Sequence, residues 1–516
     1  MKRMIIWTVL LSFTLSASQA CNKSAPEDPW KNEQGSGDQS TGLNLAAGKF
    51  YKLDPAPTDA YPDMYPCQPW SDGTKLTDEE IGTVAYKNKA VGWTDVPSAT
   101  ITVDLGVKRK IREASVHALA DNVFKIGLPS SVKVSVSSDG KKWSEQCVLH
   151  FENLPSGEKT VSESFEPVTC RYVRYEVAAP ASPCKSMLID EIVATGEYRS
   201  DWKYVPKEGA YHGAFNNATS FADEGIKDKC QNATFEERVG KKTSMVLWYQ
   251  NMREGRTFAE VQAIRRDYLG KNFGGNWRFF MYGWSPNDYT ARDVAGGILD
   301  KYWKKYFEEV RKAQSAEQDY GPVWFRPANE MNSTWVNYGN DPVNFVKMWR
   351  RLYNIAEQYS LTDYNVFVWS SADISFGSAK MKAYYPGDQY VDWIGTSCYF
   401  SKAVSYGYPS YLMKETEAVS ANKPVMISEG GYGTSACDNL LWVREWFGLK
   451  ETHPRVKAVV WENHENPSVG DRRIQKDAVA LEEYRKLVKD PYWLDAIPSE
   501  VLDEIKERKA RQNKDN

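Results

Sequence analysis

The second part of the chain alternates short apolar segments with helical stretches, and this alternation restricts the possible folds more than any other feature. Eight apolar segments follow one another between residues 209 and 461, and amphipathic stretches such as 291–313 and 343–358 lie between them. Strands that alternate with helices form parallel sheets, and eight such repeats are the pattern of a closed barrel. We therefore predict a (β/α)8 TIM barrel over residues 205–495. The predicted strands are 209–215, 244–249, 277–282, 323–327, 365–369, 391–395, 424–428 and 456–461.

The first 200 residues follow a different pattern. Apolar and polar residues alternate with a period of two in 99–105, 131–137 and 171–177, and turn groups such as Ser138-Asp139-Gly140 separate these stretches. Alternation of this kind is typical of half-buried strands, and long helical periodicity is missing. The sequence predicts an all-β sandwich over residues 44–198.

The N-terminus has the features of an export signal. Positive residues at 2–3 precede an apolar run, 4–15, that is too short to span a bilayer as a stable helix. Small and polar residues follow, and then Cys21, in an arrangement that resembles a bacterial lipoprotein cleavage site. We expect a signal peptide over 1–20 and a lipid on Cys21. A plain secretory signal is the alternative.

The two ends of the exported chain are expected to lie outside the domains. Residues 21–43 are rich in small and polar side chains and read as a lipid-anchored linker, because such a stretch buries too little apolar area to fold. Residues 496–516 read as a charged tail, helical over 499–514, at the surface or frayed. We expect a lipoprotein of the bacterial outer membrane or cell surface, attached to the membrane only by its lipid. The alternative location is the periplasm or the medium, as a periplasmic or secreted protein.

Composition excludes some functions and favours one. The net charge of −3 lacks the basic excess of a nucleic-acid-binding surface. The 19 Trp and 30 Tyr suit stacking against the flat C–H faces of sugars, although aromatic residues are also common in cores. Of eight cysteines, four lie between residues 67 and 184, where an oxidising compartment permits disulfides of undetermined pairing. The sequence contains no C-x-x-C pair of the kind that binds zinc, so we expect no metal, and we expect no cofactor. We also expect a monomer.

Two glutamates follow predicted strands. Glu330 comes after the fourth, in Arg326-Pro327-Ala328-Asn329-Glu330-Met331-Asn332, and Glu429 comes after the seventh, in Ser428-Glu429-Gly430-Gly431. The active sites of such barrels lie at the carboxyl ends of the strands, so both carboxylates should face one barrel mouth. Glycoside hydrolysis needs such a pair, one as acid and one as nucleophile or base.

These motifs resemble clan A of the glycoside hydrolases, and within it family 26, the mannanase-type family. The resemblance also includes Tyr385-Pro386-Gly387-Asp388, residues 391–395 with Tyr399, and residues 423–431. It implies a retaining hydrolase of β-linked polysaccharide or oligosaccharide, with Glu330 as acid/base and Glu429 as nucleophile. Family 26 usually has His before its acid/base, whereas this chain has Asn329, the choice of the wider clan. The retaining clan is therefore better supported than the mannan substrate.

The sandwich resembles the discoidin, or coagulation-factor type C, family of galactose-binding-like jelly rolls. The resemblance is carried by Gly92-Trp93-Thr94 with 101–106, by 135–140 with Trp143, and by 171–174 with 189–192. It implies a carbohydrate-binding-type module.

The resemblance and the strand ends suggest six further substrate-site residues. We expect Asn329 to bond the sugar 2-hydroxyl, Tyr399 to bond Glu429, and Arg326 to hold Glu429 ionised. Trp461 matches the clan's tryptophan beneath the sugar that reacts. His212 and Trp284 are candidate substrate contacts. The structural alternatives stay open: an ion pair for Arg326, a turn for Asn329, core packing for Trp461 and Trp284, and a satisfied histidine for His212. Glu462 and Glu465, after the eighth strand, are either subsite contacts or solvated carboxylates.

A second function class competes with the enzyme. A non-catalytic glycan-binding lipoprotein on a degenerate barrel would share the fold, although the glutamate pair favours hydrolysis. A protease or esterase is not supported, because the sequence contains neither G-x-S-x-G nor H-E-x-x-H.

Overall fold

A computed structural model describes residues 39–63, 73, 75–199, 202–216, 233–269, 278–316, 321–372, 379–399, 407–432, 438–466 and 470–514. The expected signal peptide, Cys21 and most of the expected linker lie outside these ranges. None of the helices within the described ranges combines the length and the hydrophobicity that a bilayer crossing requires. The described cysteines Cys147, Cys170 and Cys184 are free thiols, so these three do not form the disulfides that the sequence permitted.

The N-terminal domain is a mainly antiparallel β-sandwich, as predicted. Two long strands, β4 (Ser98–Ala120) and β8 (Gly157–Ala178), run through it side by side. Their register shifts between Asp104 and Arg109, where a bulge interrupts the pairing of the two strands. The other strands are β1 (Gln39–Asn44), β2 (Tyr51–Asp54), β3 (Val91–Thr94), β5 (Ile126–Gly127), β6 (Ser131–Ser137), β7 (Ser144–His150) and β9 (Ser186–Arg199).

The second domain is a closed barrel of eight parallel strands, as predicted. Each strand pairs in parallel with the next, and the first, β10, pairs with both β11 and β17, which closes the ring. The strands are β10 (Ala210–Asn216), β11 (Met245–Asn251), β12 (Phe279–Ser285), β13 (Val323–Pro327), β14 (Val366–Ser371), β15 (Trp393–Tyr399), β16 (Val425–Gly431) and β17 (Val456–Asn463). All eight predicted segments overlap these strands. The short strands β18 (Glu465–Asn466) and β19 (Gly470–Asp471) pair with each other, and β20 (Trp493–Leu494) adds to β10.

Alternate residues of each barrel strand enter different apolar clusters. One cluster fills the barrel interior, and its strand residues are Tyr211, Phe215, Met245, Leu247, Phe279, Met281, Trp324, Val366, Val368, Trp393, Met426, Ala458 and Val460. Residues of the opposite parity pack outward against the helices. Each fully buried large side chain contributes about 1.5–3 kcal/mol, so both layers stabilise the ring. This parity decides which side chains can reach the barrel mouth.

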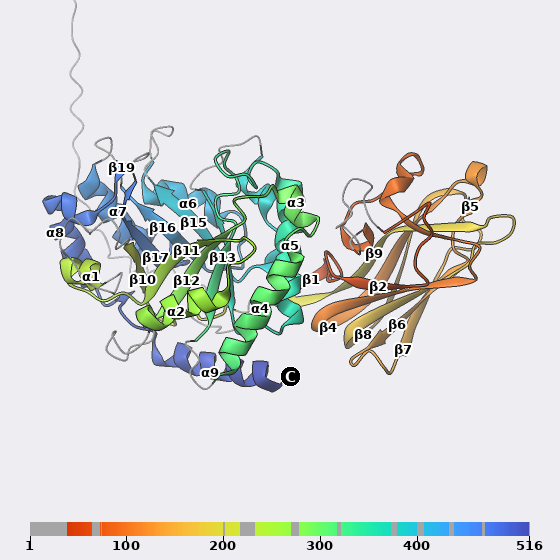
Figure 1. The fold of residues 1–516 in the computed structure, drawn as a ribbon, viewed down its shortest axis with the longest axis horizontal. Coiled ribbons are helices and arrows are strands. Elements are labelled where there is room, and N and C mark those ends of the chain that lie inside the picture. Colours follow the sequence, from red (N-terminus) through yellow and green to blue (C-terminus); the bar gives the residue numbers. More distant parts are fainter. Residues whose placement is uncertain are drawn as a thin grey trace, which may run out of the picture. The chain divides into compact units, whose positions relative to one another are not determined.

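Helices surround the strands (Figure 1). They are α1 (Ala233–Val239), α2 (Phe258–Leu269), α3 (Ala291–Ala295), α4 (Asp300–Ser315), α5 (Pro342–Gln358), α6 (Pro409–Glu417), α7 (Asn439–Thr452), α8 (Ala478–Leu487) and α9 (Ser499–Lys514). Asp341, Asp438 and Asp477 cap α5, α7 and α8 by accepting hydrogen bonds from backbone N–H groups of the first turn. The predicted helix 291–313 is instead two helices, because the chain turns at Gly296-Gly297, where Gly297 has φ 102°.

The C-terminal helix α9 belongs to the barrel. Figure 1 shows it running beneath the strands, and Val501 and Ile505 join the interior cluster. Arg508, which is 5% exposed, donates to Asp363 over 2.7 Å and to Glu504 over 2.8 Å. The expectation of a surface or frayed tail is therefore wrong for this helix, because its apolar face closes the lower end of the barrel.

Candidate active site

A β-bulge turns Glu429 into the barrel mouth. Along β16, Met426 faces the interior and Ile427 faces the helices, so strict alternation would point Glu429 outward. The register with β15 shifts instead, from Thr396 opposite Ile427 to Ser397 opposite Glu429. The extra residue reverses the parity, and bulges commonly re-aim side chains next to active sites.

Three inward-facing side chains hold the Glu429 carboxylate. Arg326 Nη1 donates to Oε2 over 2.9 Å, and Ser397 Oγ donates to Oε1 over 2.8 Å. The hydroxyl of Tyr249 donates to Oε2 in a short hydrogen bond. Arg326 Nη2 also donates to Ser397 Oγ over 3.1 Å, so the guanidinium and the serine belong to one hydrogen-bonded network around the carboxylate. Glu429 is 5% exposed and Arg326 is fully buried.

This arrangement keeps Glu429 ionised. Burial alone would raise the pKa of Glu429, but the charge of Arg326 and the hydrogen bonds from Arg326, Tyr249 and Ser397 outweigh it and lower the pKa. Burial raises the pKa of Tyr249 well above its ordinary value, so Tyr249 remains a proton donor. The site therefore presents a carboxylate that is ionised and fixed in orientation.

Glu330 stands on a tight turn after β13. Ala328 and Glu330 both have left-handed backbone conformations, with φ 49° and φ 62°. Such conformations are costly for residues other than glycine and persist only where the surroundings enforce them. Two backbone hydrogen bonds hold the turn in this conformation. Ala328 N donates to the Trp284 carbonyl, and Glu330 N donates to the Ser370 carbonyl, each over 2.9 Å.

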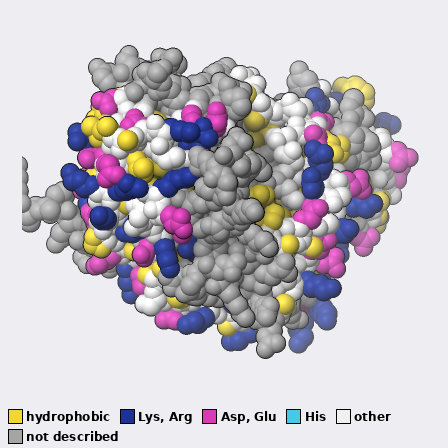
Figure 2. All heavy atoms as spheres, turned by 60° about the vertical axis from the view of Figure 1, so that its left-hand side comes forward, with side chains coloured by type: hydrophobic (Ala, Val, Ile, Leu, Met, Phe, Trp, Pro, Cys, Tyr) yellow, Lys and Arg dark blue, Asp and Glu magenta, His cyan; other side chains and the backbone are white. Residues whose placement is uncertain are grey.

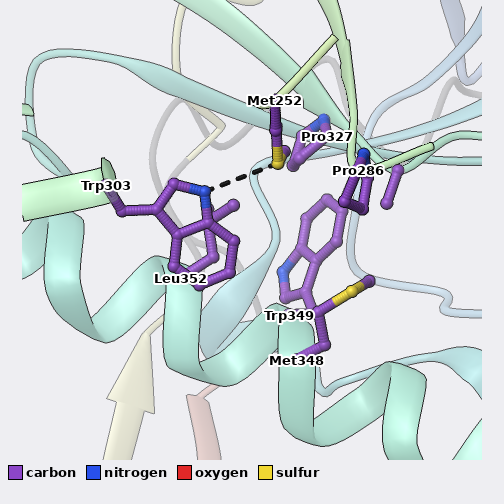
Figure 3. A pocket seen from close by; sticks show the side chains of 8 residues that line it. Met252, Pro286, Trp303, Pro327, Met348, Trp349 and Leu352 are labelled. Carbon is purple, nitrogen blue, oxygen red and sulfur yellow. Dashed lines mark hydrogen bonds between the residues drawn. The ribbon is translucent and has the colours of Figure 1, made fainter. Parts of the chain in front are cut away.

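An aromatic layer supports this turn from outside the barrel. Pro327 and Ala328 line a small apolar pocket with Trp303, Trp349 and Met252, and these side chains converge behind the strand end (Figure 3). Trp303 Nε1 points at the sulfur of Met252 over 3.4 Å. Close packing of large rings leaves the turn little freedom to relax.

Glu330 has the opposite electrostatic bias to Glu429. Burial raises the pKa of Glu330, and the negative charge of Glu429 raises it further. Trp335 Nε1 donates to Oε2 of Glu330 over 2.7 Å and partly opposes this shift. Two carboxyl groups whose pKa values move apart in one site are a recognised pattern for an acid and a nucleophile or base.

Asn329 is held by a polar network. Its Oδ1 accepts from Ser285 Oγ over 3.0 Å, and its carbonyl accepts from the Tyr338 hydroxyl over 2.8 Å. Tyr338 also reaches Ser285 over 3.3 Å. The amide group of Asn329 is thus oriented by its oxygen, and its Nδ2 makes no hydrogen bond with the described residues.

Tyr399 does not bond Glu429 as expected. Its hydroxyl donates to Glu462 Oε2 over 2.9 Å, because Tyr249 from β11 takes the position at Glu429. Glu462 is only 8% exposed and pairs with Arg472, so the description of Glu462 as a solvated carboxylate is also wrong. Glu465, by contrast, is exposed and pairs with Arg473 over 2.8 Å.

Three suggested substrate contacts point away from the mouth. Trp461 packs against Trp446 and Tyr484 with ring centroids 5.2 Å and 5.4 Å apart, and Trp284 stacks on Tyr306 at 4.6 Å. All of these rings belong to the layer between strands and helices. The His212 ring bonds the Lys242 carbonyl and the Tyr484 hydroxyl, and burial lowers its pKa to about 4. Their positions favour the core alternatives.

The sequence reasoning missed Tyr249, Ser397 and Trp335. Tyr249 and Ser397 have the same inward parity as Leu247 and Trp393 on their strands, so alternation would have selected them once one inward residue was known. Trp335 lies five residues beyond Glu330 in a loop, and no periodic signal marks it.

Figure 2 shows acidic and basic side chains interspersed over the described part of one face. Within the described residues, no group of three His, Cys, Asp or Glu side chains is placed to hold a metal ion.

Comparison with known families agrees with this geometry. Residues 278–430 match the family model of glycosyl hydrolase family 26, and residues 68–192 match that of the F5/8 type C domain. The barrel therefore carries a family 26 segment that includes Glu330 and Glu429, and the sandwich carries an F5/8 type C segment.

Individual relatives are distant. Endoglucanase H of Acetivibrio thermocellus is 26% identical over 271 residues, which are 49% of this chain and 28% of that protein. A mannan endo-1,4-beta-mannosidase of Bacillus subtilis is 26% identical over 170 residues, 30% of this chain and 43% of that protein. The chain thus spans less than half the length of either relative. A GH26 beta-mannanase structure from Bacteroides ovatus matches with a TM-score of 0.41 and 16% identity, over 56% of this chain and 91% of that chain.

Proposed function

We propose that the barrel of this chain, with its family 26 segment, is a glycoside hydrolase that cleaves a β-linked polysaccharide or oligosaccharide with retention of configuration. The observation that carries the proposal is the pairing of Glu330 and Glu429 at one barrel mouth with pKa shifts in opposite directions. Retaining glycosidases use two carboxyl groups in these two states.

In the first step, an oxygen of Glu429 forms a bond to the anomeric carbon while the bond to the leaving oxygen breaks. Glu330 gives its proton to that oxygen, so the departing sugar leaves as an alcohol. Arg326, Ser397 and Tyr249 aim the Glu429 carboxylate and keep it unprotonated.

In the second step, Glu330 accepts a proton from water as the water oxygen attacks the anomeric carbon, and Glu429 departs as a carboxylate. Formation of the covalent intermediate removes the negative charge of Glu429, which is one of the two causes that raise the pKa of Glu330. The hydrogen bond from Trp335 then favours the ionised form of Glu330. One carboxyl group can in this way act first as acid and then as base.

For the substrate we favour a mannan-type polysaccharide. The matched B. subtilis relative is named a mannan endo-1,4-beta-mannosidase, and the matched A. thermocellus relative is named an endoglucanase, so β-glucan is the nearest competitor. A panel of purified β-mannans and β-glucans, with product analysis by mass spectrometry, decides between them.

Two substitutions separate this enzyme from a non-catalytic glycan-binding protein. Glu330→Gln and Glu429→Gln should each reduce the release of reducing sugar by about 1,000-fold or more. Glu482→Gln, at an exposed position on α8, is the matched control and should retain activity. Early products should keep the anomeric configuration by NMR. An unmodified chain that binds polysaccharide and releases no sugar would support the binding protein instead.

We also propose that the protein is exported and anchored by a lipid on Cys21, with the sandwich as a carbohydrate-binding module. The sequence of residues 1–21 supports the anchor, and the F5/8 type C segment supports the module. Cys21→Ala should move the protein from the membrane fraction to the soluble fraction of its host. Retention in the membrane fraction would refute the anchor.

A further inference from the structure

Two buried serines on different barrel strands share a hydrogen bond next to the two glutamates of the mouth. Ser370 lies on β14, and Ser428 lies on β16 directly before Glu429; both serine side chains are fully buried. Their hydroxyl oxygens are 2.7 Å apart. Ser428 Oγ also donates to the Thr396 carbonyl over 3.0 Å, which uses its only hydrogen, so Ser370 is the donor within the pair. Ser370 and Ser428 are called the serine bridge below.

The serine bridge crosses the strand between its two members, because that strand has a glycine at this level. Strand β15 lies between β14 and β16, and its Gly395 pairs with Ser370. A Cβ atom at position 395 would lie 3.1 Å from Cβ of Ser428 and 3.2 Å from its Oγ, which is tighter than an ordinary van der Waals contact. The missing side chain therefore leaves the two hydroxyl groups room to meet.

Ser428 is the extra residue of the β16 bulge. The pairing with β15 passes from Ile427 directly to Glu429, so Ser428 has no partner in this ladder. Its hydroxyl connects it instead to the Thr396 carbonyl on β15 and to Ser370 on β14. The serine bridge thus holds the residue before the proposed nucleophile at the point where the ladder is interrupted.

The end of β14 also holds the turn that carries Glu330. Glu330 N donates to the Ser370 carbonyl over 2.9 Å, and Ala372 N donates to Oδ1 of the buried Asn332 over 2.7 Å. Ser370 therefore bonds the Glu330 turn through its carbonyl and the Glu429 strand through its hydroxyl. One residue links the segments that carry the two carboxyl groups.

The two glutamates depend on this link to different degrees. The Glu429 carboxylate has three direct side-chain partners, so its orientation does not require the serine bridge. Glu330 stands on a left-handed turn whose conformation persists only where its neighbours enforce it. Loss of the bridge should therefore change the distance from Glu330 to Glu429 more than the orientation of Glu429.

We propose that the serine bridge sets the spacing between Glu330 and Glu429, so that acid and nucleophile reach the same glycosidic bond together. A retaining mechanism needs the two carboxyl groups about 5–5.5 Å apart, and a displacement of about 1 Å can cost about 100-fold in rate. The inference rests on the proposed glycoside hydrolase and deepens it. Ser370 and Ser428 are positioning residues, because they act through the two glutamates.

Leaving groups of different acidity test the spacing. A 2,4-dinitrophenyl β-glycoside releases a stable anion and needs only Glu429, whereas the phenyl β-glycoside of the same β-1,4-linked disaccharide also needs Glu330 as acid. Ser370→Ala and Ser428→Ala should each lower kcat/KM about 10- to 100-fold on the phenyl glycoside and less than about 3-fold on the dinitrophenyl glycoside. The double variant should lose no more than either single variant, because both substitutions remove the same hydrogen bond.

Ser371→Ala is the matched control. Ser371 is also fully buried, and its hydroxyl donates to Thr396 Oγ1 over 3.4 Å, but it shares the outward parity of Trp369 on β14. The control should lose thermal stability as the bridge variants do and keep its kcat/KM on both glycosides. Equal losses on both glycosides in the bridge variants would overturn the inference, because the bridge would then position Glu429 alone. Unchanged rates in the folded bridge variants would overturn it as well.

The pKa of Glu330 tests the serine bridge without turnover. In the unmodified chain the charge of Glu429 helps to raise this pKa, so a greater separation should lower it in both bridge variants and leave it unchanged in Ser371→Ala. Carbon NMR titration of isotope-labelled glutamate, with the Glu330 signal assigned by Glu330→Gln, measures it. An unchanged pKa in the bridge variants would contradict the inference. An unmodified chain that hydrolyses neither glycoside would refute the proposed hydrolase, and the titration would still decide whether the bridge sets the spacing.

Discussion

Trp335 Nε1 donates to Glu330 Oε2 over 2.7 Å, although the indole is 55% exposed. The bond stabilises the ionised form of Glu330 and so lowers the pKa of a group whose burial and negative neighbour raise it. Trp335→Phe removes the donor, so the pKa of Glu330 should rise. Activity falls where Glu330 loses its proton, and the basic limb of kcat/KM should therefore move to higher pH. A basic limb that stays in place would show that the bond does not form in solution. Trp335→His, which keeps an N–H group, is the control.

Tyr249 and Tyr399 offer a matched pair of hydroxyl deletions. Tyr249→Phe removes a donor to Glu429, so the pKa of Glu429 should rise and the acid limb should shift to higher pH, with kcat about 10-fold lower. Tyr399→Phe removes a donor to Glu462 and should leave the acid limb unchanged. Both pH profiles can be recorded on one chromogenic glycoside. The reverse pattern would place Tyr399, not Tyr249, at the nucleophile.

Arg326 should stabilise the fold in a pH-dependent way. The folded-state pKa of Glu429 is lowered, so its ion pair with Arg326 contributes stability above the ordinary glutamate pKa and loses it as pH falls through the lowered value. Arg326→Met leaves the buried charge of Glu429 without its cationic partner and should cost about 3–5 kcal/mol of unfolding free energy at neutral pH. Urea unfolding should show this difference shrinking in acid. In a Glu429→Gln background the difference should be independent of pH, and a pH-dependent difference there would assign the effect elsewhere.

Replacing Trp284 tests whether its side chain packs in the core or contacts the substrate. Trp284→Ala should lower the unfolding free energy by about 3–5 kcal/mol, because it leaves a cavity against Tyr306 and Phe307. Its KM should stay close to that of the unmodified protein in conditions where the variant is folded. A raised KM without loss of thermal stability would restore Trp284 as a substrate contact.

The barrel was predictable because its strands are buried on both faces and read as separate apolar runs. The same property hid the direction of each side chain: Trp461 and Glu462 are neighbours on β17, and only pairing geometry shows that the tryptophan faces the helices. Glu429 does not follow the alternation of β16, because a bulge reverses the direction of its side chain. Its assignment came from the strand-end motif instead.

Contacts distant in sequence were beyond prediction. Tyr249 and Glu429 are 180 positions apart, and nothing local in either segment indicates their bond. The helix at 499–514 was placed correctly along the chain, but its highly charged composition concealed the two residues that enter the barrel, Val501 and Ile505. The break at Gly296-Gly297 was visible as two glycines inside an otherwise helical pattern.

The left-handed turn at Ala328 and Glu330 sets stability against activity. Each such position costs of order 1–3 kcal/mol relative to a relaxed backbone, and glycine removes most of that cost. Replacing either residue by glycine should therefore yield a protein that tolerates more heat, and at position 330 it would also lose its acid. A chain that served only to bind glycans would gain stability from these replacements by glycine. Of the two strained residues, only Glu330 has a chemical role in the proposed hydrolase, so the strain at position 330 accompanies the placement of its acid.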